Sequence, residues 1–198
     1  MKNIPYKKPK AAIKSTMNIE KITTSPQGEN MSIVLQPVSN PVAQEHYMST
    51  IVRTIDADII KKYQPSKSDE IDSCYPDGRV RIWGVVPGVG GRNSSMYDKI
   101  KKGDIVLFSS NGIVASARVT MKFYNAELAR VLWGETSNGD TWECIYLIEN
   151  LKKMNVPKEM FNKVVDYKEN YVVRGFSVID DPTRVYRFEA LFDMLCEL

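Results

Sequence analysis

The sequence has few of the residues that hold metals or form disulfides. Its 198 residues include three cysteines, Cys74, Cys144 and Cys196, and a single histidine, His46. The cysteines lie far apart and form no C-x-x-C pair, so neither a structural zinc site nor a disulfide scaffold is expected. No apolar run approaches the roughly 20 residues that span a bilayer, and no signal-peptide core follows the basic start. We therefore expect a cytoplasmic protein that has no metal, no cofactor and no membrane contact.

Phosphate-binding motifs are also missing, although the stretch RIWGVVPGVGGRN at residues 81–93 is rich in glycine. A Walker loop requires a lysine followed by serine or threonine, and Arg92-Asn93 occupies that place with the wrong spacing. A dinucleotide fingerprint requires a third glycine where Asn93 stands. The glycines therefore indicate a sharp turn or a close approach of the backbone to another group.

No catalytic constellation is present either. A Ser-His-Asp or Cys-His pair would have to use His46, whose neighbours QEHY are typical of an ordinary helical histidine. The segment ENLK at 149–152 has one residue too many for the Glu-x-Lys of metal-dependent nucleases, and Asp180-Asp181 before Pro182 is typical of a helix start. These observations predict a binding domain and no catalytic residues.

Positive charge is concentrated at the start of the chain. Residues 1–30 contain six lysines and two glutamates and so have a net charge of +4. The whole chain has a net charge of +3, so the remaining residues sum to −1. With three prolines and little periodicity, residues 1–30 are expected to be a disordered basic tail that adds salt-dependent affinity for phosphate. The remaining body is too nearly neutral to hold nucleic acid by charge alone.

Residues 31–78 are expected to form an extension packed on the domain that follows. An apolar segment at 32–38 predicts a strand, and Asn40-Pro41 predicts a capped helix that continues to about Arg53. A second helix is expected at 56–63, before Pro65. Residues 67–78 are polar and rich in turn formers, which predicts a linker or surface loop.

Strands dominate from residue 79 onward. Apolar segments predict strands at 79–86, 105–108, 113–123, 141–148 and 171–179, with a tight hairpin turn at Asn111-Gly112. Helices are expected at 126–133, between Asn125 and Gly134, and at 157–165. Tight turns between strands indicate an α+β fold in which residues 79–180 form a small curled mixed β-sheet or a partly open β-barrel with flanking helices.

The last segment, 181–198, is expected to be an amphipathic helix that Asp181 caps. Its apolar side chains recur at helical spacing: Val185, Phe188, Phe192 and Leu195, widened by Leu191 and Met194. Such a stripe is too large to face water. It packs on the sheet, or it docks against a second copy or a larger restriction-complex partner.

Two runs in the middle of the chain resemble a known superfamily. The run RIWGVVPG at 81–88 and the run MYDKIKKGDIVLF at 96–108 are similar to PUA-like domains, and most similar to EVE and YTH-like domains. Related domains form the N-terminal readers of McrB-type modification-dependent restriction systems. The resemblance covers about residues 79–180. The first loop is shorter than in YTH domains, so Tyr97 or Trp83 is expected to replace the first aromatic wall.

The resemblance implies a non-catalytic reader that takes one modified base, such as a methylated one, out of DNA and holds it in an aromatic pocket. Flipping costs a few kcal/mol and each aromatic wall returns about 1–3 kcal/mol, so two walls are needed. The expected pocket residues are Trp83, Val86, Pro87, Gly88, Asn93, Ser94, Ser95, Tyr97, Trp133 and Trp142. The expected phosphate contacts are Arg92, Lys101, Lys102, Lys122 and Arg174.

Three hypotheses remain open at this point. The first is the DNA reader in a restriction or defence context. The second is an RNA-binding PUA-like module, because the same pocket suits a base from RNA. The third is a restriction endonuclease whose metal site is assembled from dispersed acids. The aromatic residues taken singly also fit a hydrophobic core.

Overall fold

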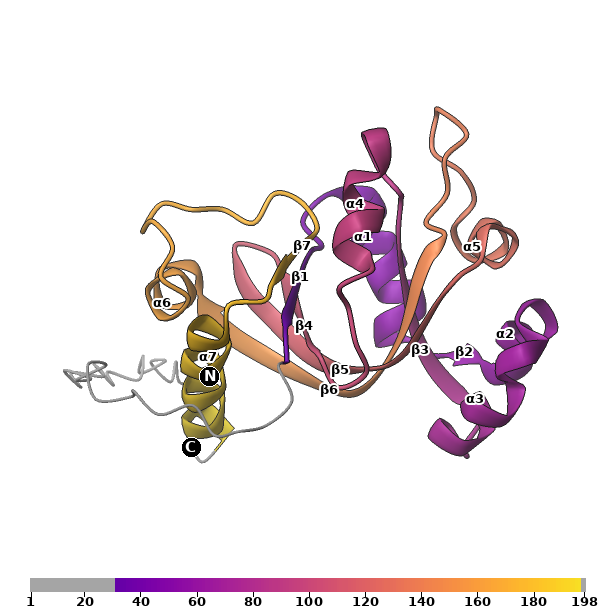
Figure 1. Ribbon diagram of the computed structural model, residues 1–198, viewed down its shortest axis with the longest axis horizontal. Coiled ribbons are helices and arrows are strands. Elements are labelled where there is room, and N and C mark those ends of the chain that lie inside the picture. Colours follow the sequence, from indigo (N-terminus) through magenta and orange to yellow (C-terminus); the bar gives the residue numbers. More distant parts are fainter. Residues whose placement is uncertain (1–30, 197–198) are drawn as a thin grey trace, which may run out of the picture.

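The protein is built on one open, mixed β-sheet of seven strands in the order β2-β3-β6-β5-β4-β1-β7 (Figure 1). The computed structural model describes residues 31–196, with side chains up to Leu191, so the tail expected at 1–30 lies outside the described residues. The strands are β1 (Ile33–Pro37), β2 (Ile55–Asp56), β3 (Arg79–Val85), β4 (Ile105–Ser109), β5 (Gly112–Tyr124), β6 (Cys144–Pro157) and β7 (Ser177–Ile179). The α+β class and the curled mixed sheet are confirmed.

Pairing in the sheet is antiparallel except between β1 and β4, which run parallel with Ile33 opposite Ile105. The segment 31–78, expected as an extension packed on the sheet, therefore contributes strands to the sheet itself. β1 lies between β4 and β7, and β2 pairs with β3 at the opposite edge. The same register brings Gln36 beside Phe108, which fixes where the chain enters its first helix.

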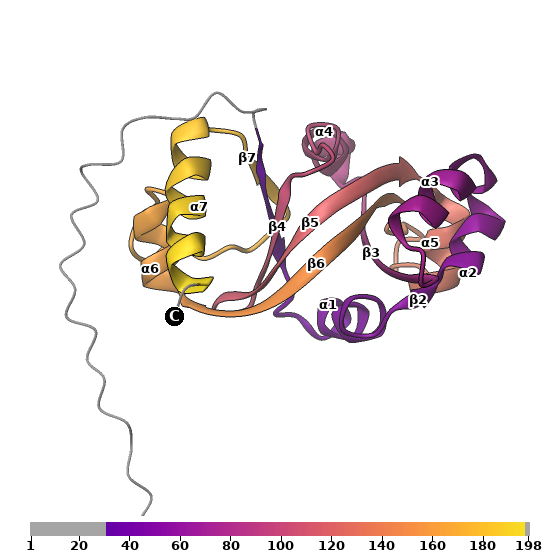
Figure 2. The ribbon, with the colours of Figure 1, turned by 90° about the horizontal axis from the view of Figure 1, so that it is seen from below.

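Helices gather mainly at the two ends of the sheet (Figures 1 and 2). The helices α6 and α7 cover the end near β7, whereas α2, α3 and α5 cover the end near β2. Their bounds are α1 (Pro41–His46), the π-helix η2 (Tyr47–Val52), α2 (Ala57–Tyr63), η3 (Pro65–Lys67), α3 (Ser68–Cys74), η4 (Val89–Gly91), α4 (Arg92–Tyr97), α5 (Ala126–Trp133), α6 (Lys158–Val164) and α7 (Pro182–Cys196).

Helix starts and the backbone angles at the hairpin follow the sequence signals closely. The Asn40 carboxamide accepts a hydrogen bond from the Ala43 amide at 2.8 Å, and Asn125 does the same for Leu128 at 2.8 Å. Asn111 and Gly112 both have positive φ, 53° and 130°, as predicted, but Gly112 already begins β5 and Ser109 pairs with Ile113, so the connection is not the two-residue Asn111-Gly112 turn. The two helix caps and the positive φ angles are confirmed because each depends on neighbouring residues alone.

Residues 67–78 do not form the loop that their polarity predicts. They contain the end of η3 and the helix α3, which buries Ile71 completely against the core cluster formed with Ile60 and Leu128. The Tyr75 hydroxyl that follows donates to the Ile148 carbonyl at 3.2 Å. Ile71 and Tyr75 thus anchor to the core a segment that is otherwise polar.

Two strand boundaries also differ from the prediction. The strand expected at 141–148 begins at Cys144 and continues to Pro157, so Trp142 lies in the loop before it. The strand expected at 171–179 is reduced to Ser177–Ile179. The buried Asn162 carboxamide donates to the carbonyls of Glu169 and Tyr171, both at 2.9 Å, and these bonds hold the preceding segment against α6 instead of the sheet.

Successive side chains along a strand point to opposite faces, so the core is divided between the two faces of the sheet. On β3, Ile82 packs with α2, α3 and α5, whereas the next residue, Trp83, packs with Phe108 and Tyr146 on the other face. Because successive side chains of a strand point to opposite faces, Trp83 faces the side from which α1 approaches. This face carries the cavity described below.

Candidate functional site

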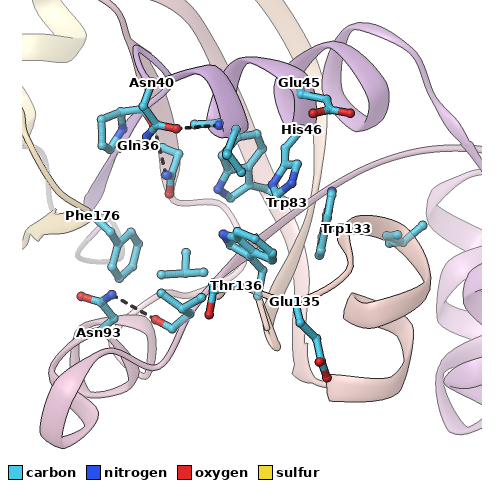
Figure 3. Close-up of a pocket in the computed structure, with 18 of the residues that line it drawn as sticks. Gln36, Asn40, Glu45, His46, Trp83, Asn93, Trp133, Glu135, Thr136 and Phe176 are labelled. Carbon is cyan, nitrogen blue, oxygen red and sulfur yellow. Dashed lines mark hydrogen bonds between the residues drawn. The ribbon is translucent and has the colours of Figure 1, made fainter. Parts of the chain in front are cut away.

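A cavity of about 780 Å³ lies between α1, the end of α5 and the loop that precedes β6 (Figure 3). Its size falls within the usual range of roughly 300–1,000 Å³ for small-molecule sites. The lining residues are Gln36, Pro37, Asn40, Val42, Ala43, Glu45, His46, Ser49, Trp83, Gly84, Val85, Val86, Asn93, Leu132, Trp133, Glu135, Thr136, Ser137, Trp142 and Phe176.

Aromatic rings form much of the wall. The His46 ring lies 4.5 Å from the Trp142 ring in an edge-on arrangement and 5.8 Å from the Trp133 ring at 32°. Trp83 is 3% exposed, and its ring lies 6.4 Å from that of His46. Figure 3 shows Phe176 and Asn93 on the side of the cavity opposite Trp133. Two tryptophans of this group, Trp133 and Trp142, are only partly buried and so remain available to a ligand.

Gly84 allows these rings to approach the sheet. A Cβ atom at this position would lie 2.2 Å from the Trp142 carbonyl oxygen and 2.6 Å from a ring carbon of Trp133. Real Cβ atoms do not approach so closely, so any other residue would displace both tryptophans. The glycine of β3 is thus a packing requirement of the aromatic wall.

His46 stands at the junction of α1 with the π-helix η2, and its carbonyl accepts a hydrogen bond from the Thr50 hydroxyl at 3.0 Å. The imidazole is 7% exposed. Burial lowers the pKa of His46 below its ordinary value of 6.5, and the nearby Glu45 carboxylate opposes that shift in part. A neutral imidazole offers one donor and one acceptor to a neighbour or ligand.

Amide side chains add polar groups to the same cavity. Gln36, at the end of β1, is 7% exposed, and its carbonyl oxygen faces the Tyr146 hydroxyl at 3.4 Å. The Asn93 amide donates to the Val86 carbonyl at 3.0 Å, which ties α4 to the end of β3. Carboxamides carry both donors and acceptors, so they suit the edge of a planar polar ligand.

Two indole N–H groups of the wall are buried without an acceptor. They are Nε1 of Trp83 and Nε1 of Trp133, and neither has a partner among residues 31–196. A buried donor without a partner costs roughly 1–3 kcal/mol. Such groups are uncommon in folded proteins and often mark places where function takes precedence over stability.

The structure brings together five of the expected pocket residues in the cavity lining: Trp83, Val86, Asn93, Trp133 and Trp142. Tyr97 lies elsewhere. It is the last residue of α4, is fully buried, and donates its hydroxyl to the Phe123 and Ile145 carbonyls. Because Tyr97 satisfies its only polar group within the core, it is a core residue and not a wall.

The other four expected pocket residues belong to the turn beside the cavity and are absent from its lining: Pro87, Gly88, Ser94 and Ser95. Pro87 accepts the Asn93 amide N–H through its carbonyl, and Gly88 has a φ of 79°. The Ser95 hydroxyl donates to the Gly91 carbonyl at 3.2 Å. These residues shape the turn into α4, which positions Asn93.

The expected phosphate contacts do not form one cluster. Arg92 and Arg174 are exposed, and each lies within two residues of a lining residue, Asn93 or Phe176. Lys101 and Lys102 lie in the turn before β4, and neither belongs to the cavity lining.

The Lys122 ammonium group is already hydrogen-bonded within the protein. Its ammonium group donates to the carbonyls of Tyr97 and Asp98, at 3.1 and 2.7 Å, and lies 5.0 Å from the centre of the Tyr97 ring. Burial lowers the pKa of Lys122. The side chain thus stabilises the end of α4.

Sequence reasoning missed several lining residues, above all Gln36, His46 and Phe176. The first two belong to residues 31–78, for which the sequence offered no family resemblance. His46 was noticed but assigned only an ordinary helical place. The available signal was the helix predicted after Asn40, because one helical turn separates Val42 and His46 on its face.

Neither a metal-binding group nor a membrane-spanning helix is found among the described residues. Among residues 31–196, no group of three histidine, cysteine or acidic side chains is arranged to hold a metal ion. In the same part of the chain, no helix combines the length and apolar character needed to cross a bilayer.

Comparison with known proteins shows a likeness in fold to a solved structure. No family model matches the sequence, and no curated protein does. Among solved structures, the chain is similar to the N-terminal domain of Thermococcus gammatolerans McrB bound to m5C DNA. The TM-score is 0.61 at 13% sequence identity, and the match covers 83% of this chain and 99% of that one. The chain therefore has the fold of an McrB N-terminal domain, as the resemblance to PUA-like readers predicted.

Proposed function

We propose that this protein is a non-catalytic DNA reader that holds one flipped, modified base in the aromatic cavity. The observation that carries the proposal is the cavity wall, in which His46, Trp133 and Trp142 converge within a fold shared with a domain bound to m5C DNA. A restriction or defence context and a larger partner belong to the same proposal through the likeness to McrB.

The energetics favour a cage with more than one ring. Extruding a base costs a few kcal/mol, and stacking on an aromatic side chain returns about 1–3 kcal/mol per ring. Trp133 and Trp142 together can therefore offset the cost of flipping. Neutral His46 supports both rings without adding a buried charge.

Discrimination between bases requires polar contacts because a methyl group adds only about 1 kcal/mol of burial. Gln36 and Asn93 supply carboxamides from two sides of the cavity. A base edge that fails to match them leaves a buried polar group unpaired, which costs more than the methyl group returns. In this proposal the aromatic rings hold the base and the amides select it.

Contacts to the DNA backbone are assigned to Arg92 and Arg174. Both are exposed, and in the sequence they lie one residue before Asn93 and two residues before Phe176, which line the cavity. Phosphate contacts position a protein on DNA without specifying sequence. Lys101 and Lys102 have no part in this arrangement because they lie outside the lining, and Lys122 has none because its ammonium group is bonded within the protein.

The proposal is tested by fluorescence anisotropy with the full chain and labelled duplexes of one sequence. The duplexes carry cytosine, methylcytosine, hydroxymethylcytosine or methyladenine at one central position. We expect at least tenfold tighter binding to one modified duplex, no displacement by RNA of the same sequence and no magnesium-dependent cleavage. Equal affinity for all duplexes would disprove base reading, and preference for RNA or cleavage would support the two other hypotheses.

Substituting Trp133 and Trp83 in turn distinguishes a pocket residue from a core residue. Trp133→Ala removes a partly exposed wall, so the preference for modified DNA should vanish while cooperative melting persists. Trp83→Ala, the matched control, empties a site that is 3% exposed and should destabilise the fold by about 3–5 kcal/mol. Loss of cooperative melting in Trp133→Ala would make that residue structural.

A further inference from the structure

The cavity is much larger than a methylated base. At the roughly 30 Å³ that a water molecule occupies in the liquid, about nine non-hydrogen atoms of methylcytosine take up at most about 270 Å³. The cavity volume is about 780 Å³. A ligand that fills this space while its base is stacked on the tryptophans must carry a further group of about ten or more non-hydrogen atoms.

The sugar-phosphate backbone of the flipped nucleotide is poorly suited to fill the rest of the cavity. Its sugar and phosphates stay joined to the strand and so remain at the mouth of the cavity. Among the lining residues there is no lysine or arginine, whereas Glu45 and Glu135 contribute carboxylates. Carboxylates repel phosphate but accept hydrogen bonds from hydroxyl groups.

The remaining lining groups suit a neutral ligand rich in hydroxyls. Ser137 and Thr136 provide hydroxyls, Asn40 and Asn93 provide carboxamides, and the tryptophans provide flat apolar faces. Glu135 accepts a hydrogen bond from Arg130, and a carboxylate has about four acceptor positions, so it can accept others.

We propose that the site reads a base that carries a sugar-sized, hydroxylated substituent, of which glucosylated hydroxymethylcytosine is the simplest example. This inference rests on the proposed function and adds the class of modification. In this arrangement the base stacks in the aromatic wall, and the substituent extends toward Glu45, Glu135 and Ser137. A methyl group would leave most of that space to water.

The experiment compares four labelled duplexes that differ at one cytosine: unmodified, methylated, hydroxymethylated and glucosylated. Anisotropy titrations with the full chain should give at least tenfold tighter binding to the glucosylated duplex than to the methylated one. Tighter or equal binding to the methylated duplex overturns this inference and leaves the proposed function intact. Failure to distinguish any modified duplex from the unmodified one overturns both.

A competition arm identifies the source of the sugar. Methyl glucoside at millimolar concentration should not displace the glucosylated duplex, because it lacks the base that stacks on the tryptophans. Full displacement would mean that the site binds free sugars, and would overturn the base-linked form proposed above.

Substitutions at the rim test where the substituent lies. The double variant Glu45→Ala, Ser137→Ala should reduce the ratio of glucosylated to methylated affinity at least fivefold, with cooperative melting retained. Glu127→Ala, the control, makes the same charge change at an exposed position of α5 outside the lining and should leave the ratio unchanged. An unchanged ratio in the double variant contradicts the proposed position of the substituent.

Discussion

Gly84 has no positive φ, so its missing side chain serves close packing and not a turn. We predict that Gly84→Ala destabilises the protein by about 1–3 kcal/mol and abolishes binding, because the new methyl group overlaps Trp133 and the Trp142 backbone. Thermal melting and anisotropy measure the two effects. Gly175→Ala is the control, since nothing lies within 4 Å of its added Cβ and its φ is ordinary. Wild-type binding by Gly84→Ala would contradict this role.

His46 makes stability depend on pH. Burial lowers the pKa of His46 in the folded protein below 6.5, so near and below pH 6.5 the unfolded chain binds more protons. The free energy of unfolding should therefore decrease as the pH falls from about 7.5 to 5.5. Urea denaturation at several pH values measures this change.

The control for that titration is His46→Gln, which keeps a polar side chain in the wall and removes the titrating group. Its free energy of unfolding should change less over the same pH range. An identical pH dependence in both proteins would assign the effect to other groups.

At the scale of elements, α7 shows how an amphipathic helix is used. Val185, Phe188 and Leu191 are at most 5% exposed, and the Phe188 ring lies 6.1 Å from that of Phe161 on α6. These residues favour packing on the sheet and α6 over docking to a partner. The side chains of Phe192, Met194 and Leu195 lie outside the described residues.

We predict that Phe188→Asp destabilises the protein by about 4 kcal/mol or more, since it places a charge in a fully buried site. Circular dichroism and light scattering would show loss of cooperative melting. Thr183→Asp, at an exposed position in the first turn of α7, should be nearly neutral. If Phe188→Asp instead gave a folded monomer from a dimer, the stripe would be an interface.

The charge of the whole molecule predicts its behaviour on plain DNA. Removing residues 1–30 removes +4 and leaves −1. The shortened protein should bind unmodified DNA weakly, and the slope of log affinity against log salt should correspond to only about two phosphate contacts, such as Arg92 and Arg174 would make. Binding titrations between about 50 and 200 mM salt measure this slope. A slope as steep as that of the full chain would reveal a basic face elsewhere.

The sequence alone determined most of the elements. Caps at Asn40 and Asn125, the positive φ angles at Asn111 and Gly112 and the apolar strands depend on residues a few positions apart, so their chemistry is readable without the fold. The helix α3 was not predicted, because its stability comes from burying Ile71 against distant parts of the chain. Local polarity carries no information about such a contact.

Which residues meet in the cavity depends on how distant strands pair. The sequence indicated Trp83, Trp133 and Trp142, but it also offered Tyr97, an aromatic residue of the same neighbourhood that faces the core. Parallel pairing of β1 with β4 places Gln36 at the end of the sheet and sends α1, with His46, over the tryptophans. That pairing joins segments some seventy residues apart, and whether a ring lines a cavity or fills the core depends on such long-range register, which no local pattern specifies.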